Sequence, residues 1–169
     1  EITEEEAQLE GEGDLSLNTL KEVKKWINFR HRLVPYLYHT ACQTHQSGIP
    51  MIRPLVMEYP KDPIAKIQNL SYMLGDALLI SPGFDRDEYE LYLPEGRWQD
   101  IESKEVYEGM TFVHIENKAF ADGGTSLRVF QKEGTSIPLF TQKEVLHVPA
   151  QLWKQEDLEF MTFQKKDVD

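Results

Sequence analysis

Carboxylates gather at one point of the chain, between a predicted turn and a predicted strand: Asp85, Asp87, Glu88 and Glu90. Two carboxyl groups held about 5 Å apart can cleave a glycosidic bond, one as nucleophile and one as acid and base. Several carboxylates on one loop can instead bind calcium, but that pattern needs a glycine and a terminal glutamate that this window lacks. Since a strand places Glu88 and Glu90 on one face and Tyr89 on the other, we interpret the cluster as a solvated sheet edge, where charge prevents aggregation.

The other titratable candidates indicate structure rather than chemistry. Three histidines lie on or near one predicted helix, at separations of eight and six: His31, His39 and His45. Two imidazoles share a metal at a separation of four, so we interpret these as satisfied or exposed helix histidines. Cys42 has no partner motif and is interpreted as a buried packing cysteine. Asp76 follows a glycine and is expected in a turn, where its carboxylate bonds local amides.

Aromatic side chains could form a stacking platform for a sugar: Trp26, Tyr36, Tyr38, Trp98, Tyr107 and Trp153. Trp98 follows a Pro-Glu-Gly-Arg turn, which favours an exposed position. Aromatic residues are more often part of a core, and we prefer that interpretation. There is no glycine-rich phosphate loop, Gly-x-Ser-x-Gly elbow or CxxC pair. The residues therefore predict no catalytic residue, no cofactor site and no metal site within this sequence.

Composition places the chain among ordinary globular proteins, with 40% hydrophobic and 28% charged residues. No apolar run approaches the ~20 residues of a membrane span, and no basic footprint for nucleic acid or a membrane surface is present. We expect neither kind of partner. The single cysteine is compatible with a reducing compartment, and a cytoplasmic location is the expectation. Because residue 1 is Glu and the start is acidic, we expect a chain without a signal peptide that begins inside a longer product.

The net charge of −11 is concentrated at the start of the chain. Residues 1–14 contain seven acids and no basic residue, which leaves −4 for the other 155 residues. An interaction arm is one interpretation of this acidic segment. We favour the other, a flexible solvated tail, because it offers few large apolar side chains to bury.

A long amphipathic helix is predicted over residues 15–47, at about 30 residues unusually long for a small domain. Its stripe recurs at spacings of three and four: Leu20, Val23, Ile27, Arg30, Val34, Leu37 and Ala41. Pro35 falls inside it, at a cost of about 3 kcal/mol in a helix interior. A helix tolerates this when packing holds both halves in line, so we expect a large body against it.

The next segment has the pattern of an α/β protein. Residues 51–58 form a nearly continuous apolar run, which predicts a strand buried on both faces as in a parallel sheet, although Pro54 argues against full pairing. Asp62 and the proline after it can open a short helix over 63–73. Residues 15–75 therefore predict helix–strand–helix, with only one strand of the sheet that such a unit requires.

From about Asp76 the pattern changes to short strands separated by Gly- and Pro-containing turns. The strand candidates are 77–81, 88–93, 105–107, 111–116, 127–131, 136–140, 145–148 and 158–164. This spacing predicts a β-sandwich over residues 76–169. The predicted fold class is therefore mainly β, a sandwich preceded by a long helix and a helix–strand segment.

Five stretches, in order, resemble glycoside hydrolase family 31. Residues 29–38 resemble its late barrel helix, and 51–55 (Met-Ile-Arg-Pro-Leu) its last barrel strand. Residues 72–82 resemble its entry into a β-sandwich, 92–100 its Leu-Pro-x-Gly-x-Trp turn, and 129–139 a later sandwich strand. Each match alone is modest, and their order along the chain makes them specific together.

The resemblance implies both a fold and an activity. Members of the family are retaining α-glycosidases, chiefly α-glucosidases and α-xylosidases, with a (β/α)8 barrel followed by two sandwiches. Residues 15–75 would then be the end of the barrel and residues 76–169 the proximal sandwich. The family's two catalytic aspartates lie upstream, in Trp-x-Asp-Met-Asn-Glu and Arg-Trp-x-Gly-Asp motifs that this sequence lacks. No catalytic residue is therefore assigned, and the fragment alone is expected to be inactive.

The sequence departs from the family pattern at several positions. Leu70 and Ser71 stand where the family often has Asp-Gln, Arg128 stands in place of a proline, and Lys132 in place of an arginine. These departures concern how the sandwich meets its barrel, and they are compatible with a divergent subgroup that acts on another substrate.

Three interpretations follow. The first is the C-terminal part of an α-glycosidase, whose partners are the missing barrel and distal sandwich and, in the full protein, a carbohydrate. The second is a carbohydrate-binding sandwich and the third a structural one, both without hydrolase activity. Burying each apolar side chain of the helix stripe is worth about 1.5–3 kcal/mol. We therefore expect the stripe to fold back on its own sandwich or, preferentially, to mediate self-association through residues 15–45.

Overall fold

The computed structural model describes residues 17–83, 88–116, 127–141 and 150–165. The expected flexible tail at 1–14 and the strand expected at 145–148 lie outside these ranges. In chain order, β1 to β10 are Ile52–Pro54, Tyr72–Leu74, Leu78–Ser81, Glu88–Leu93, Arg97–Asp100, Val106–Glu108, Thr111–Glu116, Arg128–Lys132, Thr135–Phe140 and Leu158–Phe163. The helices are α1 (Leu17–Arg32), α2 (Val34–Ser47) and α3 (Leu55–Glu58), with 3₁₀ turns at Ala150–Leu152 and Gln155–Asp157.

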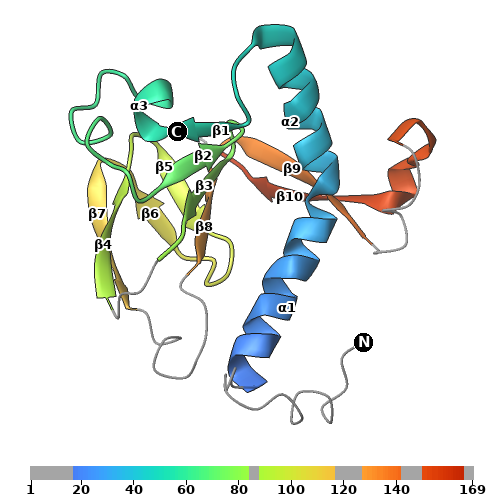
Figure 1. The fold of residues 1–169 in the computed structure, drawn as a ribbon, viewed down its shortest axis with the longest axis horizontal. Helices are drawn as coiled ribbons and strands as arrows, with labels where there is room; N and C mark the ends of the chain where they lie inside the picture. The colour runs from blue at the N-terminus through green and yellow to red at the C-terminus, as the bar shows by residue number, and fades with distance from the viewer. Residues whose placement is uncertain (1–16, 84–87, 117–126, 142–149, 166–169) are drawn as a thin grey trace, which may run out of the picture.

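The strands form one large sheet and two small ones (Figure 1). The large sheet has the order β1-β2-β3-β8-β5-β6, and all of its pairings are antiparallel. The small sheets are the antiparallel pairs β4–β7 and β9–β10. The prediction of a mainly β, sandwich-like domain is confirmed.

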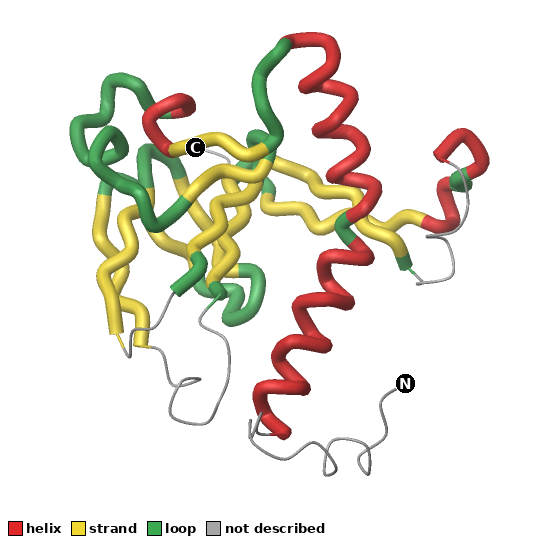
Figure 2. The backbone as a smooth tube through the Cα atoms, viewed as in Figure 1, coloured by secondary structure: helices red, strands yellow, loops and turns green. Residues whose placement is uncertain are grey.

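The large sheet is covered on both faces, because alternate residues of its strands point to opposite sides. Leu79 and Phe130 belong to the core that the large sheet shares with β4 and β7. Leu78, Ile80 and Val129 belong to a second core, shared with the helices and β9. Helix side chains therefore fill one face of the sandwich, and the tube in Figure 2 shows the long red helical rod lying beside the sheets.

The rod is two helices rather than one, which corrects the predicted uninterrupted helix. α1 ends at Arg32, Leu33 forms a turn, and Pro35 lies in the first turn of α2. A proline in a first turn removes an amide that has no helical acceptor, so little is lost there. The Leu33 amide donates to the Phe29 carbonyl at 2.9 Å, and the Leu37 amide donates to the Leu33 carbonyl at 3.0 Å. These bonds keep the two helices in line.

The segment after α2 also differs from its prediction. Residues 51–58 contain a three-residue strand, β1, and then the short helix α3 instead of one parallel strand buried on both faces. β1 pairs antiparallel with β2 at the edge of the large sheet, where Pro54 is tolerated. Residues 63–73 form turns and then β2 rather than a helix. The Asp62 carboxylate accepts the amides of Ile64 (2.8 Å) and Ala65 (3.2 Å) and so caps the first of these turns.

The residues that depart from the family pattern find partners within the sandwich. Lys132 on β8 donates to the Tyr59 hydroxyl at 2.9 Å, and its ammonium lies 5.9 Å from the centre of the Trp98 ring. Arg128 lies 3.5 Å from a carboxylate oxygen of Asp100. Both departures therefore have a local structural role.

Candidate functional site

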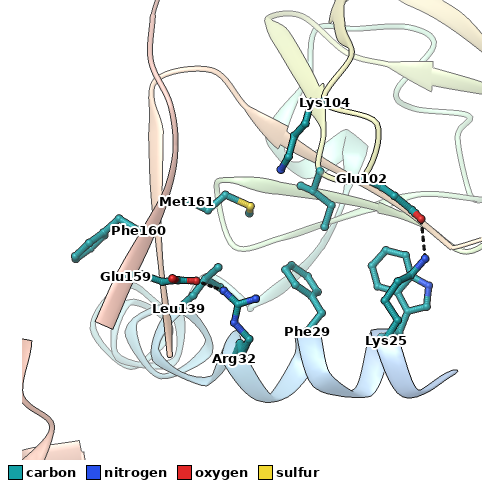
Figure 3. Close-up of a pocket in the computed structure, with 11 residues that line it drawn as sticks. Lys25, Phe29, Arg32, Glu102, Lys104, Leu139, Glu159, Phe160 and Met161 are labelled. Carbon is teal, nitrogen blue, oxygen red and sulfur yellow. Dashed lines mark hydrogen bonds and ion pairs between the residues drawn. The ribbon is translucent and has the colours of Figure 1, made fainter. Parts of the chain in front are cut away.

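A cavity of about 450 Å³ lies between α1, the turn after β5 and the β9–β10 pair (Figure 3). We call it the α1 cavity; its lining residues are Lys25, Trp26, Phe29, Arg32, Ile101, Glu102, Lys104, Leu139, Glu159, Phe160 and Met161. The four residues from α1 follow helical spacing, so one face of the helix presents them together. The other lining residues lie more than 65 positions later in the sequence, and tertiary packing brings them next to α1.

The charged residues of the α1 cavity form two ion pairs across it. Lys25 Nζ lies 2.6 Å from Glu102 Oε1. Arg32 pairs with Glu159 through Nη2 and donates through Nε to the Phe140 carbonyl at 3.1 Å. The pairs join α1 to the turn after β5 and to β10, so they hold the walls together and set donors and acceptors around the opening.

Two side chains that line the α1 cavity carry a nitrogen with no hydrogen-bond or ion-pair partner among the described residues. The indole nitrogen of Trp26 is buried and has no hydrogen-bond partner among the described residues. Lys104 has no ion-pair partner among the residues that the structure describes. In Figure 3 its side chain extends toward the cavity from the wall opposite α1. Its backbone is left-handed, with φ of 64°, a conformation that costs a non-glycine residue energy and often marks functional sites.

The turn that presents Lys104 is built by Asp100. This buried carboxylate accepts the amides of Glu102 (2.7 Å) and Ser103 (3.2 Å), while the Lys104 amide donates to the Asp100 carbonyl at 3.0 Å. Gln99 closes the turn by donating to the Lys104 carbonyl at 3.2 Å. The backbone of the left-handed residue is therefore held by several bonds, which fix the point from which its side chain extends.

An apolar groove of about 580 Å³ lies on the other side of α1. Its lining residues are Val23, Trp26, Ile27, Phe29, Arg30, Leu33, Leu37, Met51, Ile52, Tyr72, Leu74, Ile80, Leu127 and Val129. Ile27 is 48% exposed and Ile52 is 60% exposed. The predicted helix stripe is thus divided: Leu37 packs against the second core, and Val23 and Ile27 remain exposed at the groove.

A smaller, more polar cavity of about 430 Å³ is lined by two of the titratable residues considered in the sequence analysis. His39 and Asp76 both line it, next to Tyr36 and Thr135. Asp76 lies in a turn as predicted and is exposed. The Tyr36 hydroxyl donates to the Leu74 carbonyl at 2.7 Å and accepts the Ala77 amide at 3.2 Å. Its hydrogen-bonding capacity is therefore used by the fold.

The carboxylate cluster is a solvated edge as far as the structure describes it. Glu88 and Glu90 are exposed on β4 and Tyr89 is buried, as the alternation predicts. They flank His114 on β7, whose Nδ1 lies 2.9 Å from Glu90 and whose Nε2 lies 3.4 Å from Glu88. The hydrogen bond to Glu90 raises the pKa of His114 above its ordinary value. Asp85 and Asp87 lie outside the described residues.

Cys42 lies opposite to its predicted position. It is exposed rather than buried, because it lies about 200° around the helix from the buried Thr40. Trp98 is fully buried, which agrees with the core interpretation preferred for the aromatic residues. It is the second residue of β5 and points into the core, where its indole nitrogen donates to the Pro94 carbonyl at 2.8 Å.

The other candidates are dispersed rather than brought to one site. His31 is partly buried, and His39 and His45 are exposed. No group of three or more His, Cys, Asp or Glu side chains within the described ranges could hold a metal. Of the aromatic residues considered for a stacking platform, only Trp26 lines the α1 cavity, and the ring centres of Tyr38 and Trp153 lie 5.5 Å apart.

The remaining cavity residues were not candidates in the sequence. The recurrence of Lys25, Phe29 and Arg32 at spacings of four and three is a signal that could have placed them on one face. No local pattern connects them with Lys104 or Glu159, because those contacts depend on how β5 and β10 pack.

Comparison with known proteins identifies the family. The family model described as "Glycosyl hydrolase family 31 C-terminal domain" matches residues 48–143, which is more than half of the chain. The chain belongs to glycoside hydrolase family 31. The resemblance that the sequence motifs indicated is confirmed.

Over the aligned segments, relatives within family 31 are about one third identical to the chain. Human neutral alpha-glucosidase AB is 35% identical over 113 residues, which is 64% of the chain and 11% of the relative. Alpha-glucosidase 2 of Bacillus thermoamyloliquefaciens is 33% identical over 129 residues, 75% of the chain and 16% of the relative. A solved cycloalternan-forming enzyme from Listeria monocytogenes, in complex with a pentasaccharide substrate, has a TM-score of 0.71 at 33% identity, over 86% of the chain and 14% of that enzyme.

The chain therefore spans between a tenth and a sixth of the length of these family 31 proteins. The matched region, residues 48–143, corresponds to the C-terminal domain of the family. Within the part of the chain that is described, no helix has the length and apolar character needed to span a membrane.

Proposed function

We propose that the chain is the C-terminal part of a retaining α-glycosidase that, in the complete protein, removes terminal α-linked glucose or xylose from oligosaccharides or glycosides. The observation that carries the proposal is the match of residues 48–143 to the family 31 C-terminal domain. Relatives that are named α-glucosidases support the glucose alternative. The parts of the parent enzyme absent from this sequence are a barrel and a distal sandwich.

We propose further that the isolated chain is inactive. Retaining hydrolysis needs two carboxyl groups about 5 Å apart on either side of the bond that is cleaved. The family's two aspartate motifs are absent from the sequence. In the α1 cavity, Glu102 and Glu159 are each paired with a cation, which supports a structural role for both carboxylates.

The same proposal assigns the two segments of the chain to two domains of the parent enzyme. Residues 15–75 supply the end of the barrel, and residues 76–169 supply the proximal sandwich. The apolar groove supports this division, since it leaves Val23, Ile27 and Ile52 open for the rest of the parent enzyme to cover. In the isolated chain, a second copy takes that place through residues 15–45.

A carbohydrate-binding or structural sandwich without hydrolase activity is the alternative. The α1 cavity favours its binding form, because it combines aromatic side chains with hydrogen-bonding groups around an opening. The two functions differ in one respect that is easily observed: only the glycosidase requires a catalytic barrel in the same polypeptide.

Sequencing the reading frame upstream of the codon for Glu1 tests the proposal. We expect both aspartate motifs there, within a region long enough for a (β/α)8 barrel. An upstream region without them would exclude the glycosidase and leave the binding module. We propose a cytoplasmic location, which fractionation of cells that express the full reading frame would test.

A further inference from the structure

We infer that the α1 cavity is a carbohydrate-binding site of its own, which takes one or two ring units of a short neutral oligosaccharide and acts apart from catalysis. This inference rests on the proposed carbohydrate function and extends it to a site within this chain. The cavity volume of about 450 Å³ falls within the roughly 300–1,000 Å³ of small-molecule sites. It is open on one side, so a chain end can enter while the rest of the oligosaccharide stays in solvent.

The floor of the cavity suits the apolar faces of a sugar ring. Phe29, Leu139 and Met161 contribute carbon and sulfur surface between the two ion pairs. Figure 3 shows Phe29 projecting from α1 into the space between Lys25 and Arg32. The C–H face of a pyranose packs on such a surface, while its hydroxyls point outward to the charged rim.

The rim suits hydroxyl groups. Each hydroxyl both donates and accepts a hydrogen bond, and each ion pair of the rim, Lys25 with Glu102 and Arg32 with Glu159, contains one donor and one acceptor. With three cations and two glutamates the rim carries both signs of charge, so phosphate serves as the competing probe in the test below. The two ion pairs also restrict the conformations of these side chains before a ligand binds. Less side-chain conformational entropy is therefore lost on binding.

Two side chains that line the cavity, Trp26 and Lys104, carry donors with no partner among the described residues. The buried Trp26 indole nitrogen has no partner among the described residues, and a buried donor left unpaired is costly. The Lys104 ammonium extends toward the cavity from a left-handed turn that Asp100 and Gln99 hold in place. Hydroxyl oxygens of a bound ring would accept from the exposed Lys104 ammonium, and the ring would contact the Trp26 side chain.

The test uses the three tryptophan side chains as reporters in a nitrogen–proton NMR spectrum of the 169-residue chain. Maltotriose is the probe, and Trp26→Phe assigns the indole signal of Trp26. We expect maltotriose to shift the Trp26 signal with an affinity in the millimolar range. The Trp98 signal should stay in place, because its indole already donates to the Pro94 carbonyl in the opposite core.

Lys104→Gly tests the named donor without threatening the fold. Glycine adopts the left-handed backbone readily, so the substitution removes the ammonium and relieves strain together. We expect about tenfold weaker binding of maltotriose, the loss typical of a hydrogen bond from a charged donor. The matched control is Met110→Gly, which changes another left-handed residue (φ 57°) that does not line the cavity and should leave binding unchanged.

Several outcomes would overturn the inference. They are a Trp26 signal that does not respond to maltotriose, a response to inorganic phosphate in place of the sugar, and unchanged binding in Lys104→Gly. Failure here is distinguishable from failure of the proposed function. A chain that binds no sugar can still be part of a glycosidase, and a chain that binds maltotriose can still lack an upstream barrel.

Discussion

The Tyr36 hydroxyl occupies the space that a Cβ on residue 75 would need. Gly75 has a left-handed backbone with φ of +63°, and a Cβ built on it overlaps with this hydroxyl and lies 3.1 Å from Oγ1 of Thr40. The same hydroxyl bonds the backbone on both sides of that turn, at Leu74 and Ala77. The contact therefore joins α2 to the entry of the sandwich, across the proposed boundary between barrel and sandwich segments.

Gly75→Ala should destabilise the chain by about 2–4 kcal/mol, because backbone strain adds to the overlap with Tyr36. Urea unfolding monitored by circular dichroism measures the change. The matched control is Gly48→Ala, where φ is +75° and nothing lies within 4 Å of the added carbon. That variant should lose only about 1 kcal/mol, from strain alone. Equal losses in the two variants would show that the Tyr36 contact contributes nothing.

Asp62→Ala should cost about 2 kcal/mol, because one carboxylate serves two parts of the structure. Oδ1 caps the turn that follows it, and Oδ2 accepts the Tyr92 hydroxyl at 2.6 Å. Tyr92→Phe removes only the second interaction and should cost about half as much. Thermal unfolding of both variants tests the order, and a larger loss for Tyr92→Phe would contradict it.

Alkaline pH should destabilise the fold through its buried phenols. Burial raises the pKa of Tyr36, Tyr92 and Tyr107 to about 12 each, from 10.0. A folded-state pKa above the unfolded one means that the stabilisation is complete below pH 10 and is lost as the pH rises toward 12. The urea midpoint should therefore fall across that window, and less so in Tyr107→Phe. A flat profile would show that these hydroxyls titrate normally.

His114 should titrate above an ordinary histidine, since the bond to Glu90 favours its charged form. The contribution of this interaction to stability is complete below pH 6.5 and is lost as the pH rises through the raised pKa. The ring-proton shift of His114 measures the pKa directly. Glu90→Gln should lower it more than Glu88→Gln does, because the Glu88 carboxylate is farther away, at 3.4 Å. A larger effect of Glu88→Gln would reverse the assignment.

The isolated chain should self-associate through the apolar groove, and Ile27→Asp should weaken that association by placing a charge among its apolar side chains. Sedimentation at tens of micromolar compares the masses. Lys24→Asp is the control on the same helix, because Lys24 is exposed and does not line the groove. A monomeric parent chain, with Ile27→Asp changing neither mass nor stability, would rule the interface out.

Local pattern predicted the longer strands well. The alternation of β4 and β7 located both strands at the bounds that the structure shows, since each has six residues and one solvated face. It failed for β1 and β2, whose three residues are too few for a period to emerge. It also missed β5, which has four residues and begins directly after a turn. The α1 cavity depends on contacts between α1 and strands far along the chain. Local sequence patterns cannot predict such contacts.

The measurement that tests the central claim most directly is the release of 4-nitrophenol from its α-glucoside and α-xyloside. Two proteins are compared: the purified 169-residue chain and the polypeptide translated from the complete reading frame that contains it. We predict that the complete polypeptide hydrolyses at least one of the two glycosides and that the isolated chain shows no turnover above background. Turnover by the isolated chain, or an intact polypeptide inactive on both glycosides, would contradict the account.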